Sequence, residues 1–287
     1  MGLYSYRHVI ANERTCFWLL HRLRWPQGVR CPTCGGQKTW RMREQGMLRY
    51  RCKHCHRHFS IRTGTALAHS QLPLTKWVLA VGLFRIGLSA RALARELAVS
   101  RRIGWALLHR IRDVLQKDVL MHKLQGQIEI DDTYLGGRRK GKRGRGAALK
   151  TIVLGLKVRG GPVRSLVIPA LTTAHVHAIL KAHVARGARI VTDELPVYHD
   201  FRAAGLRHRR IQHTKHFVRG PIHTQGIEGH WGHLKPTLVA RHRSISHRHA
   251  QRYLTEADFK YRFPSGVDFT AFVLTRLLQT PHPLPNR

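Results

Sequence analysis

Two cysteine pairs near the start of the chain constrain its folding more than any other feature. Cys31 and Cys34 are separated by two residues, Cys52 and Cys55 repeat that spacing, and 17 residues lie between the pairs. This spacing is typical of two knuckles that converge on one tetrahedral zinc ion, with a hairpin between them. Disulfides are the alternative, but a reducing cytosol disfavours them. We therefore predict one structural zinc ion per chain, which supplies much of the stability of a domain too small to fold alone. The fifth cysteine, Cys16, falls in a helical apolar stretch and is expected to be a core thiol.

The composition favours a nucleic-acid partner. Lysine and arginine number 51 against 15 aspartates and glutamates, which gives a formal net charge of +36 and a pI near 11.6. Ribosomal proteins, chromatin-like proteins and DNA-processing enzymes carry such an excess. Hydrophobic residues make up 43% of the chain, enough for packed cores, and the basic residues are spread over its whole length. Both observations argue against a disordered basic arm.

The sequence gives no sign of a membrane partner. The longest apolar run, near Trp77, stops at Arg85, short of the roughly 18 residues that a membrane span needs. The N-terminus lacks the apolar segment of a signal peptide. We therefore expect a cytoplasmic protein.

Residues 72–116 are typical of three short helices. The first is expected to end near Gly87, and the second to run from Ser89 to about Leu97. Ser100 is a suitable capping residue for the third.

The second and third of these helices have the pattern of a helix–turn–helix. The positions expected to face inward are Ala92, Leu93, Leu97, Ile103, Ala106 and Leu107. Arg101, Arg102 and Trp105 stand near the start of the third helix, where residues that read a DNA groove lie. The alternative is an ordinary three-helix bundle with solvated arginines.

From Gln127 onward the hydrophobic period changes. QIEIDDTYLGG, LKTIVLGLKVRG and VRSLVIPAL are typical of three strands, and TTAHVHAILKAHVA of a helix capped by Thr172 or Thr173. ARIVTDE indicates a buried strand, and a final helix is expected from about Thr224. This is the order of a ribonuclease-H-like α/β domain, in which the first strand, the fourth strand and a late helix bring three acids together.

Three carboxylates fall at those places in an otherwise basic chain: Asp131, Asp193 and Glu228. Two hard divalent cations about 4 Å apart need anionic oxygen ligands and support in-line attack on a phosphodiester. Lys235 follows Glu228 by seven residues, or two helical turns, so the two share a helix face. The alternative is that the spacing is accidental.

Neighbouring acids make the ligand set ambiguous. Asp132 follows Asp131 and Glu194 follows Asp193, so in each strand one acid should face the site and the next point away. Glu129 shares the face of Asp131 and is expected either to reach the metal or to support a ligand. Pairing with arginines is the structural alternative, but exposed pairs contribute little.

A glycine-rich cationic loop, GGRRKGKRGRGAA, separates the first two strands. Such a loop cannot pack and is suited to lying along a phosphate backbone. Its basic residues are Arg138, Arg139, Lys140, Lys142, Arg143 and Arg145.

Over nearly its full length the chain resembles the zinc-ribbon DDE transposases of bacterial insertion sequences, the ISXO-like group. The matching segments are RWPQGVRCPTCGG, RYRCKHCHRHFSIRTGTALAHSQLPLTKW, IEIDDTYLGG, VTDELPVYHDF and HTQGIEGHWGHLKPTL. The GT after the second knuckle, the DxTYxGG-like end of the first strand and the E-x2-W-x3-K helix are specific in combination.

The resemblance implies a catalytic site and its cofactors. Asp131, Asp193 and Glu228 would bind two Mg²⁺ ions, for which Mn²⁺ is a substitute, and Lys235 would be the trailing basic residue. His213 falls where the family tends to have a histidine of no clear role.

Two departures from the family pattern bear on this site. Gln225 replaces an asparagine common in relatives and competes with Glu228 as third ligand. Pro236 follows Lys235 and disfavours helical geometry at the lysine.

Together these patterns predict a multidomain α+β protein, the domains being an N-terminal helix (1–28), a zinc ribbon (29–70), a helix–turn–helix-like segment (71–122) and a ribonuclease-H-like catalytic domain (123–287). The resemblance implies a nucleoid-associated bacterial enzyme that binds double-stranded DNA at terminal inverted repeats, hydrolyses the phosphodiester at the element end and joins the 3′-OH to target DNA. Because two ends must meet, we expect a homodimer or higher oligomer. The alternatives are a non-catalytic DNA-binding regulator or domesticated transposase, and a nuclease that cuts without joining.

Overall fold

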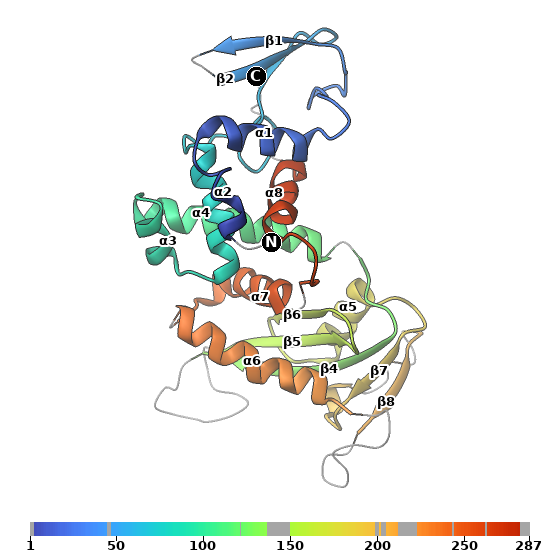
Figure 1. Ribbon diagram of the computed structural model, residues 1–287. Coiled ribbons are helices and arrows are strands. Elements are labelled where there is room, and N and C mark those ends of the chain that lie inside the picture. The colour runs from blue at the N-terminus through green and yellow to red at the C-terminus, as the bar shows by residue number, and fades with distance from the viewer. Residues whose placement is uncertain are drawn as a thin grey trace. The chain divides into compact units, whose positions relative to one another are not determined.

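The computed structural model describes residues 3–44, 47–120, 122–136, 150–198, 201, 205–211, 223–242, 244–261 and 263–281. Within the chain, residues 1–114 and 264–287 form one compact unit and residues 115–263 form a second (Figure 1). The division falls inside a helix that the sequence analysis placed wholly before the catalytic domain.

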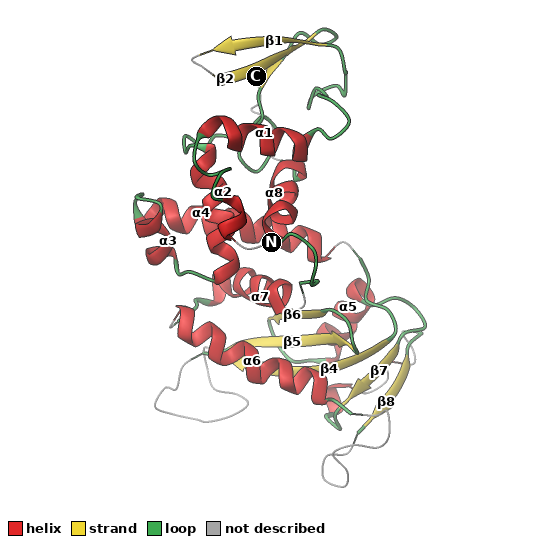
Figure 2. Cartoon of the chain, in the orientation of Figure 1, coloured by secondary structure: helices red, strands yellow, loops and turns green. Residues whose placement is uncertain are grey.

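The first unit opens with a short 3-10 helix (Leu3–Tyr6) and helix α1 (Glu13–Arg24). Strands β1 (Thr39–Glu44), β2 (Met47–Cys52) and β3 (His58–Phe59) follow (Figure 2). In the described residues these strands form an antiparallel sheet in the order β1-β2-β3. The hairpin predicted between the cysteine pairs is therefore confirmed.

Aromatic rings give the ribbon its small core. Tyr50 stacks on Phe59 with ring centroids 5.4 Å apart, and Trp25 meets Tyr50 edge-on at 5.6 Å. All three side chains are buried. Their contacts tie the strands to the end of α1.

Three helices follow the ribbon: α2 (Leu74–Ile86), α3 (Ala90–Glu96) and α4 (Arg101–Leu120). Gly87 ends α2 with a left-handed φ of 87°. The Ser89 hydroxyl accepts a hydrogen bond from the Ala92 N–H, and the Ser100 hydroxyl accepts one from the Ile103 N–H. These caps confirm the helix boundaries predicted from the sequence.

The packing of α3 against α4 differs in part from the prediction. The leucines expected to face inward are buried, namely Leu93, Leu97 and Leu107. Ile103 and Ala106 are exposed instead, so that part of the prediction was wrong. Gly104 takes the inward position instead. The backbones of α3 and α4 approach so closely there that a Cβ would lie 2.8 Å from the carbonyl oxygen of Ala90.

Helix α8 (Phe269–Gln279) belongs to the first unit. It packs against α1 and α2, and its Leu277 carbonyl accepts a hydrogen bond of 2.9 Å from the Ala66 N–H. Its apolar face is buried there. The segment after residue 263 thus lies in the first compact unit, and the catalytic domain bounds 123–287 stay a prediction.

The second unit is built on a mixed sheet. Its strands are β4 (Gln127–Leu135), β5 (Thr151–Val158), β6 (Val163–Ile168), β7 (Arg189–Thr192) and β8 (Arg207–Arg210). Among the described residues the order is β6-β5-β4-β7-β8, with β4, β5 and β6 antiparallel and with β7 parallel to both β4 and β8. The first four strands match the prediction, but β8 was missed because RHRR has no apolar alternation.

Helices cover both faces of this sheet (Figure 1). They are α5 (Thr173–His183), the 3-10 turn Pro196–Tyr198, α6 (Gln225–His242) and α7 (His247–Tyr261). One apolar cluster joins the sheet to α5 through Ile130, Ile190 and Val176. A second joins it to α6 through Val153 and Trp231. The two faces of the sheet therefore pack against different helices, one against α5 and the other against α6.

Helix α7 covers the edge strand β6 with side-chain hydrogen bonds. Gln251 accepts a bond from the Val167 N–H and donates one to the Ser165 carbonyl. Asp258 accepts bonds from the N–H and the hydroxyl of Ser165. These contacts satisfy backbone groups that an open sheet edge would expose.

Candidate active site and zinc site

The two cysteine pairs come together in the ribbon. All four Sγ atoms lie within 4.8 Å of one another. The Sγ atoms of Cys31 and Cys55 are 3.6 Å apart, as are those of Cys34 and Cys52. Because Zn–S bonds are about 2.3 Å long, tetrahedral zinc holds its sulfurs roughly 3.8 Å apart. The four thiols therefore fit a zinc ion.

The two knuckles repeat one backbone geometry. Gly35 and His56 each follow the second cysteine of a pair, and both have a left-handed φ, of 73° and 58°. Their N–H groups donate to the carbonyls of Cys31 and Cys52, at 2.9 and 3.1 Å. The first knuckle meets this requirement with glycine and the second with a histidine.

The thiols differ in character. Hydrogen bonds from the backbone N–H of Cys55, together with that of His54, lower the pKa of Cys52 to about 6, which favours the thiolate that zinc binds. Cys16 is fully buried, and burial raises its pKa to about 12. Its Sγ lies 3.1 Å from the Val9 carbonyl oxygen. The prediction of a core thiol at Cys16 is confirmed.

Asp131 lies in the middle of β4, opposite Gly155 of β5. Its Oδ2 accepts a hydrogen bond of 2.9 Å from the indole N–H of Trp231 on α6. Burial, followed by the charge of Asp132, raises the pKa of Asp131 to about 6. Asp193 adds to this rise. The carboxylate is thus half-buried and lies near two further carboxylates.

Asp193 directly follows β7, which pairs in parallel with β4. Gln127 is paired with Arg189 and Glu129 with Val191, and the same offset brings Asp193 level with Asp131. The Oδ1 of Asp193 accepts a bond from the Leu195 N–H at 3.1 Å. Asp131, in the middle of β4, and Asp193, just after the end of β7, therefore lie at the same level of adjacent strands.

Asp132 points to the other side of the sheet. Its Oδ1 accepts a hydrogen bond of 3.0 Å from the hydroxyl of Tyr198, a buried residue beside the α5 cluster. Burial and the nearby aspartates raise the pKa of Tyr198. The predicted alternation holds here, because Asp131 reaches α6 and Asp132 does not.

Glu228 lies in the first turn of α6 and is exposed. Its Oε1 accepts a hydrogen bond of 2.6 Å from the Thr224 hydroxyl. Lys235 is also exposed, and α6 continues through Pro236 to His242. The proline therefore does not end the helix at the lysine.

The predicted acids are only partly assembled. In the part of the chain that the structure describes, the cysteines are the one group of at least three potential ligands that close on a common point. Asp131 and Asp193 lie within electrostatic reach of each other. Glu228 instead bonds within its own helix turn, and Gln225 and Glu194 are exposed.

Glu129 is buried and joins three elements. Its carboxylate accepts hydrogen bonds from Arg159 at 3.0 and 3.2 Å and from the Ile227 N–H at 2.9 Å. A Cβ at Gly226 would lie 2.6 Å from its Oε2. Glu129 thus binds the N-terminus of α6, the helix that carries Glu228. The sequence predicted either that Glu129 reaches the metal or that it supports a ligand.

Trp231 is the second residue whose role the sequence did not assign. Besides its bond to Asp131, its ring covers Gly155, where a Cβ would lie 2.4 Å from the ring. The available signal was the tryptophan of the E-x2-W-x3-K pattern and a glycine inside an apolar strand. A glycine inside a strand marks the close approach of another group.

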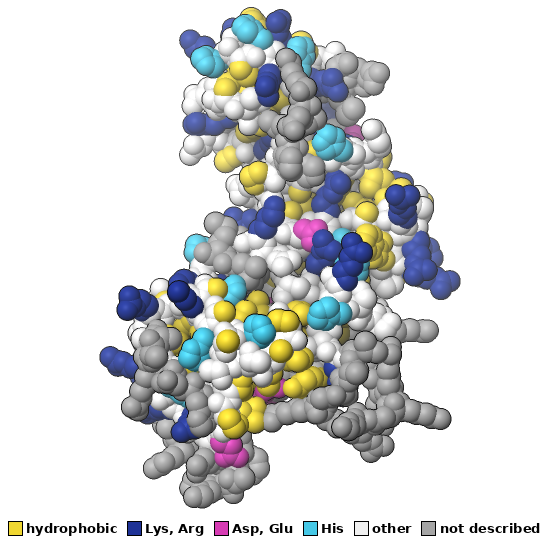
Figure 3. Space-filling model, turned by 180° about the vertical axis from the view of Figure 1, so that it is seen from behind, with side chains coloured by type: hydrophobic (Ala, Val, Ile, Leu, Met, Phe, Trp, Pro, Cys, Tyr) yellow, Lys and Arg dark blue, Asp and Glu magenta, His cyan; other side chains and the backbone are white. Residues whose placement is uncertain are grey.

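The residues predicted to contact DNA are unequally described. Arg101, Arg102 and Trp105 are exposed at the start of α4. The six basic loop residues predicted between Arg138 and Arg145, and also His213, lie outside the described residues. Figure 3 shows lysine and arginine side chains scattered over one face of the protein, with few acids among them. In the described part of the chain, no helix is both long and apolar enough to cross a bilayer.

Comparison with known proteins finds relatives of both parts of the chain. Residues 123–262 match an ISXO2-like transposase domain, and residues 11–58 match a transposase zinc-ribbon domain. An uncharacterized protein in transposable element ISH50 of Halobacterium salinarum is 31% identical over 265 residues, covering 85% of this chain and 89% of the relative. An uncharacterized transposase-like protein of Haemophilus influenzae is 26% identical over 99 residues, covering 34% of this chain and 80% of the relative. The chain therefore belongs to the family of zinc-ribbon transposases with an ISXO2-like transposase domain.

Proposed function

We propose that this protein is a DDE-type DNA transposase whose second unit is a ribonuclease-H-like catalytic domain. The sheet order and the parallel pairing of β4 with β7 support this reading. The observation that carries it is the placement of Asp131 and Asp193 at one level of two adjoining parallel strands. Two carboxylates that repel each other in a basic protein are expected where a cation neutralises them.

Asp131, Asp193 and Glu228 would hold two Mg²⁺ ions, with Mn²⁺ as a substitute. Such a pair, when bound, activates the attacking oxygen and stabilises the leaving oxygen of an in-line displacement. Carboxylate oxygens are the donors that these hard cations prefer. To act as a ligand, the exposed Glu228 carboxylate would leave the hydroxyl of Thr224.

The surrounding residues orient this set. Trp231 donates to Oδ2 of Asp131 and so orients that carboxylate. Glu129 anchors the start of α6 and so sets the position of Glu228. Lys235 is exposed two turns further along α6, where its ammonium group contacts a DNA phosphate near the cut.

The reaction follows from this arrangement. Water would attack the phosphorus at the element end and release the element's 3′-OH. This 3′-OH would then attack a phosphorus of target DNA, forming a new phosphodiester while the target's own P–O3′ bond breaks and its 3′-OH leaves. No covalent enzyme intermediate is needed. The start of α4 and the ribbon recognise the terminal inverted repeats, the basic loop 138–145 follows the phosphate backbone, and a dimer or higher oligomer brings the two ends together.

The test is cleavage of a labelled element end in Mg²⁺, with a band-shift assay beside it. Asp131→Asn, Asp193→Asn and Glu228→Gln should each abolish cleavage and leave end binding intact, because each removes a negative ligand and preserves volume. Glu194→Gln is the matched control and should cleave normally. Near-normal cutting by any of the first three variants removes that residue from the set.

Two further outcomes decide between alternatives. If Gln225→Ala is silent and Glu228→Gln is not, Glu228 is the third ligand. If the unmodified protein binds ends but neither cuts nor joins them, it is a non-catalytic regulator. Cutting without joining identifies a nuclease.

A further inference from the structure

A groove in the first unit is lined by none of the cysteines or acids described above. Its walls come from α1, from the hairpin β1–β2 with β3, and from the segment 60–74, and it encloses about 820 Å³. Ligand pockets commonly enclose about 300–1,000 Å³. The groove is therefore large enough for a ligand of nucleotide size.

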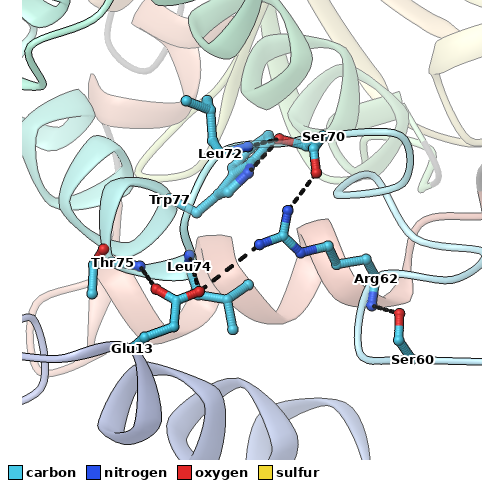
Figure 4. A network of polar contacts seen from close by, with 8 residues as sticks. All are labelled: Glu13, Ser60, Arg62, Ser70, Leu72, Leu74, Thr75 and Trp77. Atoms are coloured by element: carbon cyan, nitrogen blue, oxygen red, sulfur yellow. Dashed lines mark hydrogen bonds and ion pairs between the residues drawn. The ribbon is translucent and has the colours of Figure 1, made fainter. Parts of the chain in front are cut away.

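Hydrogen bonds hold one wall of this groove in a defined shape (Figure 4). The Arg62 guanidinium donates to the Ser70 carbonyl and lies 3.9 Å from Glu13. The Ser70 hydroxyl accepts a bond of 3.0 Å from the indole N–H of Trp77. Arg24 adds bonds to two further carbonyls of the same segment. These hydrogen bonds fix the conformation of this wall of the groove.

The groove carries positive charge that the protein does not neutralise. Its lining includes four arginines and one glutamate. That glutamate, Glu13, already accepts bonds from the N–H groups of Leu74 and Thr75, at 2.7 and 3.1 Å. Arg14 and Arg43 are exposed, and neither has a hydrogen-bond or ion-pair partner among the described residues. An anionic ligand is the chemistry that complements this lining.

Aromatic surface accompanies the charge. Trp18 of α1 lines the groove and is 45% exposed, although large aromatic rings are normally buried. Phe17 lines the groove as well and meets the Trp18 ring edge-on at 5.3 Å. An exposed ring beside free arginines is the combination that binds unpaired nucleotides, because the bases stack and the phosphates pair with the cations.

We propose that this groove binds an unpaired DNA strand. The inference rests on the proposed function only in taking DNA as the partner. The groove suits a single strand better than a duplex. A hollow of this size admits individual nucleotides, and the bases of a duplex, being paired and stacked, cannot turn their faces toward a protein ring. Its tests are independent of the acidic site.

The experiment measures binding of the full-length, zinc-loaded protein to a fluorescent oligothymidine and to a duplex element end, without Mg²⁺. Trp18→Ala should weaken oligothymidine binding about tenfold, since stacking of a base contributes about 1–3 kcal/mol. Arg43→Gln should lower the slope of log K against log salt by about 0.7 for the single strand. Duplex binding should fall less than oligothymidine binding in both variants, because the start of α4 is unchanged.

Matched controls lie on the same hairpin outside the groove. Trp40 is 44% exposed, and Arg51 lies 5.5 Å from its ring centroid. Trp40→Ala and Arg51→Gln should leave strand binding unchanged, and zinc content checks that every ribbon is folded. Equal losses for strand and duplex, unchanged strand binding, or equal losses in the controls would each overturn the proposal. End cleavage, measured separately in Mg²⁺, shows whether the proposed function fails while strand binding stands.

Discussion

The cysteine site and the acidic site of this protein are assembled in opposite ways. The zinc ligands all lie between residues 31 and 55, and their sulfur atoms close on one point. The acids come from β4, from the end of β7 and from α6, so the site spans residues 131 to 228. Only Asp131 and Asp193 are within electrostatic reach, while Glu228 bonds to Thr224.

The difference teaches where each site obtains its geometry. Closing a short loop costs little entropy, and two knuckles with the same backbone bonds aim four thiols without outside help. The acids repel one another, so contacts outside the ligand set must hold them. Trp231 and Glu129 provide those contacts. The zinc site is therefore a property of its own segment, and the acidic site is a property of how α6 packs on the sheet.

The largest effect is expected from breaking the zinc site. Cys31→Ser should release the zinc ion and unfold the ribbon, because structural zinc contributes about 10–16 kcal/mol to the folding of small zinc domains. Metal analysis of the purified protein, with near-ultraviolet circular dichroism of the Trp25 and Tyr50 core, measures the loss. Cys16→Ser is the control. Cys16 is buried but is not one of the four clustered cysteines, so this variant should keep its zinc ion. Protein that lacks zinc but has an ordered ribbon contradicts the assignment.

The acidic site should also be disrupted by a change at Glu129, which is not one of the proposed metal ligands. Glu129→Gln removes the charge that pairs with Arg159 in a buried position, which typically costs roughly 3–5 kcal/mol. Urea unfolding should show this loss, and cleavage should fall as the start of α6 loosens. Glu194→Gln removes an exposed charge and should change stability by less than about 0.5 kcal/mol. Equal stability of the two variants would show that Glu129 is not an anchor.

Replacing a predicted metal-binding acid, Asp131, should raise the stability of the protein, in contrast to replacing Glu129. Folding raises the pKa of Asp131 from 3.8 to about 6, so its ionised form destabilises the metal-free protein. Two pKa units correspond to roughly 3 kcal/mol, and Asp131→Asn should be more stable by about that amount at pH 7 while losing cleavage. The carboxyl binds its proton more tightly in the folded state, so metal-free wild-type stability should fall as pH rises from about 4 to about 6 and then level off. The asparagine variant should lack this fall, and a parallel fall in both proteins would contradict the assignment.

The same contrast explains what the sequence could predict. The zinc ligands, the caps at Ser89 and Ser100 and the left-handed Gly87 are local features, and each was recognised from a few neighbouring residues. The core strands were recognised from their apolar alternation. Asp131 and Asp193 followed from the order of those strands.

What the sequence missed depends on contacts distant along the chain. The anchoring role of Glu129 exists only because Ile227, 98 residues later, donates its N–H. Helix α8 joins the first unit because its apolar face is buried against α1 and α2, which no local pattern indicates. Gly104, rather than Ile103, lies where α3 approaches α4 closely. Each of these depends on a tertiary contact whose partner the local pattern does not identify.

The smallest effect should arise inside the zinc site, at the left-handed position that follows the second cysteine of each knuckle. His56 holds a left-handed φ of 58° at the position that Gly35 holds with 73°, and a side chain in this conformation costs about 1 kcal/mol. His56→Gly should therefore stabilise the ribbon by about 0.5 kcal/mol, the gain being reduced by the greater freedom of glycine in the unfolded chain. Gly35→Ala should destabilise it by about 1 kcal/mol, although no atom lies within 4 Å of the added Cβ. Competition with a zinc chelator measures both, and a loss of zinc affinity in His56→Gly would mean that the histidine side chain supports the site in a way that its backbone geometry does not.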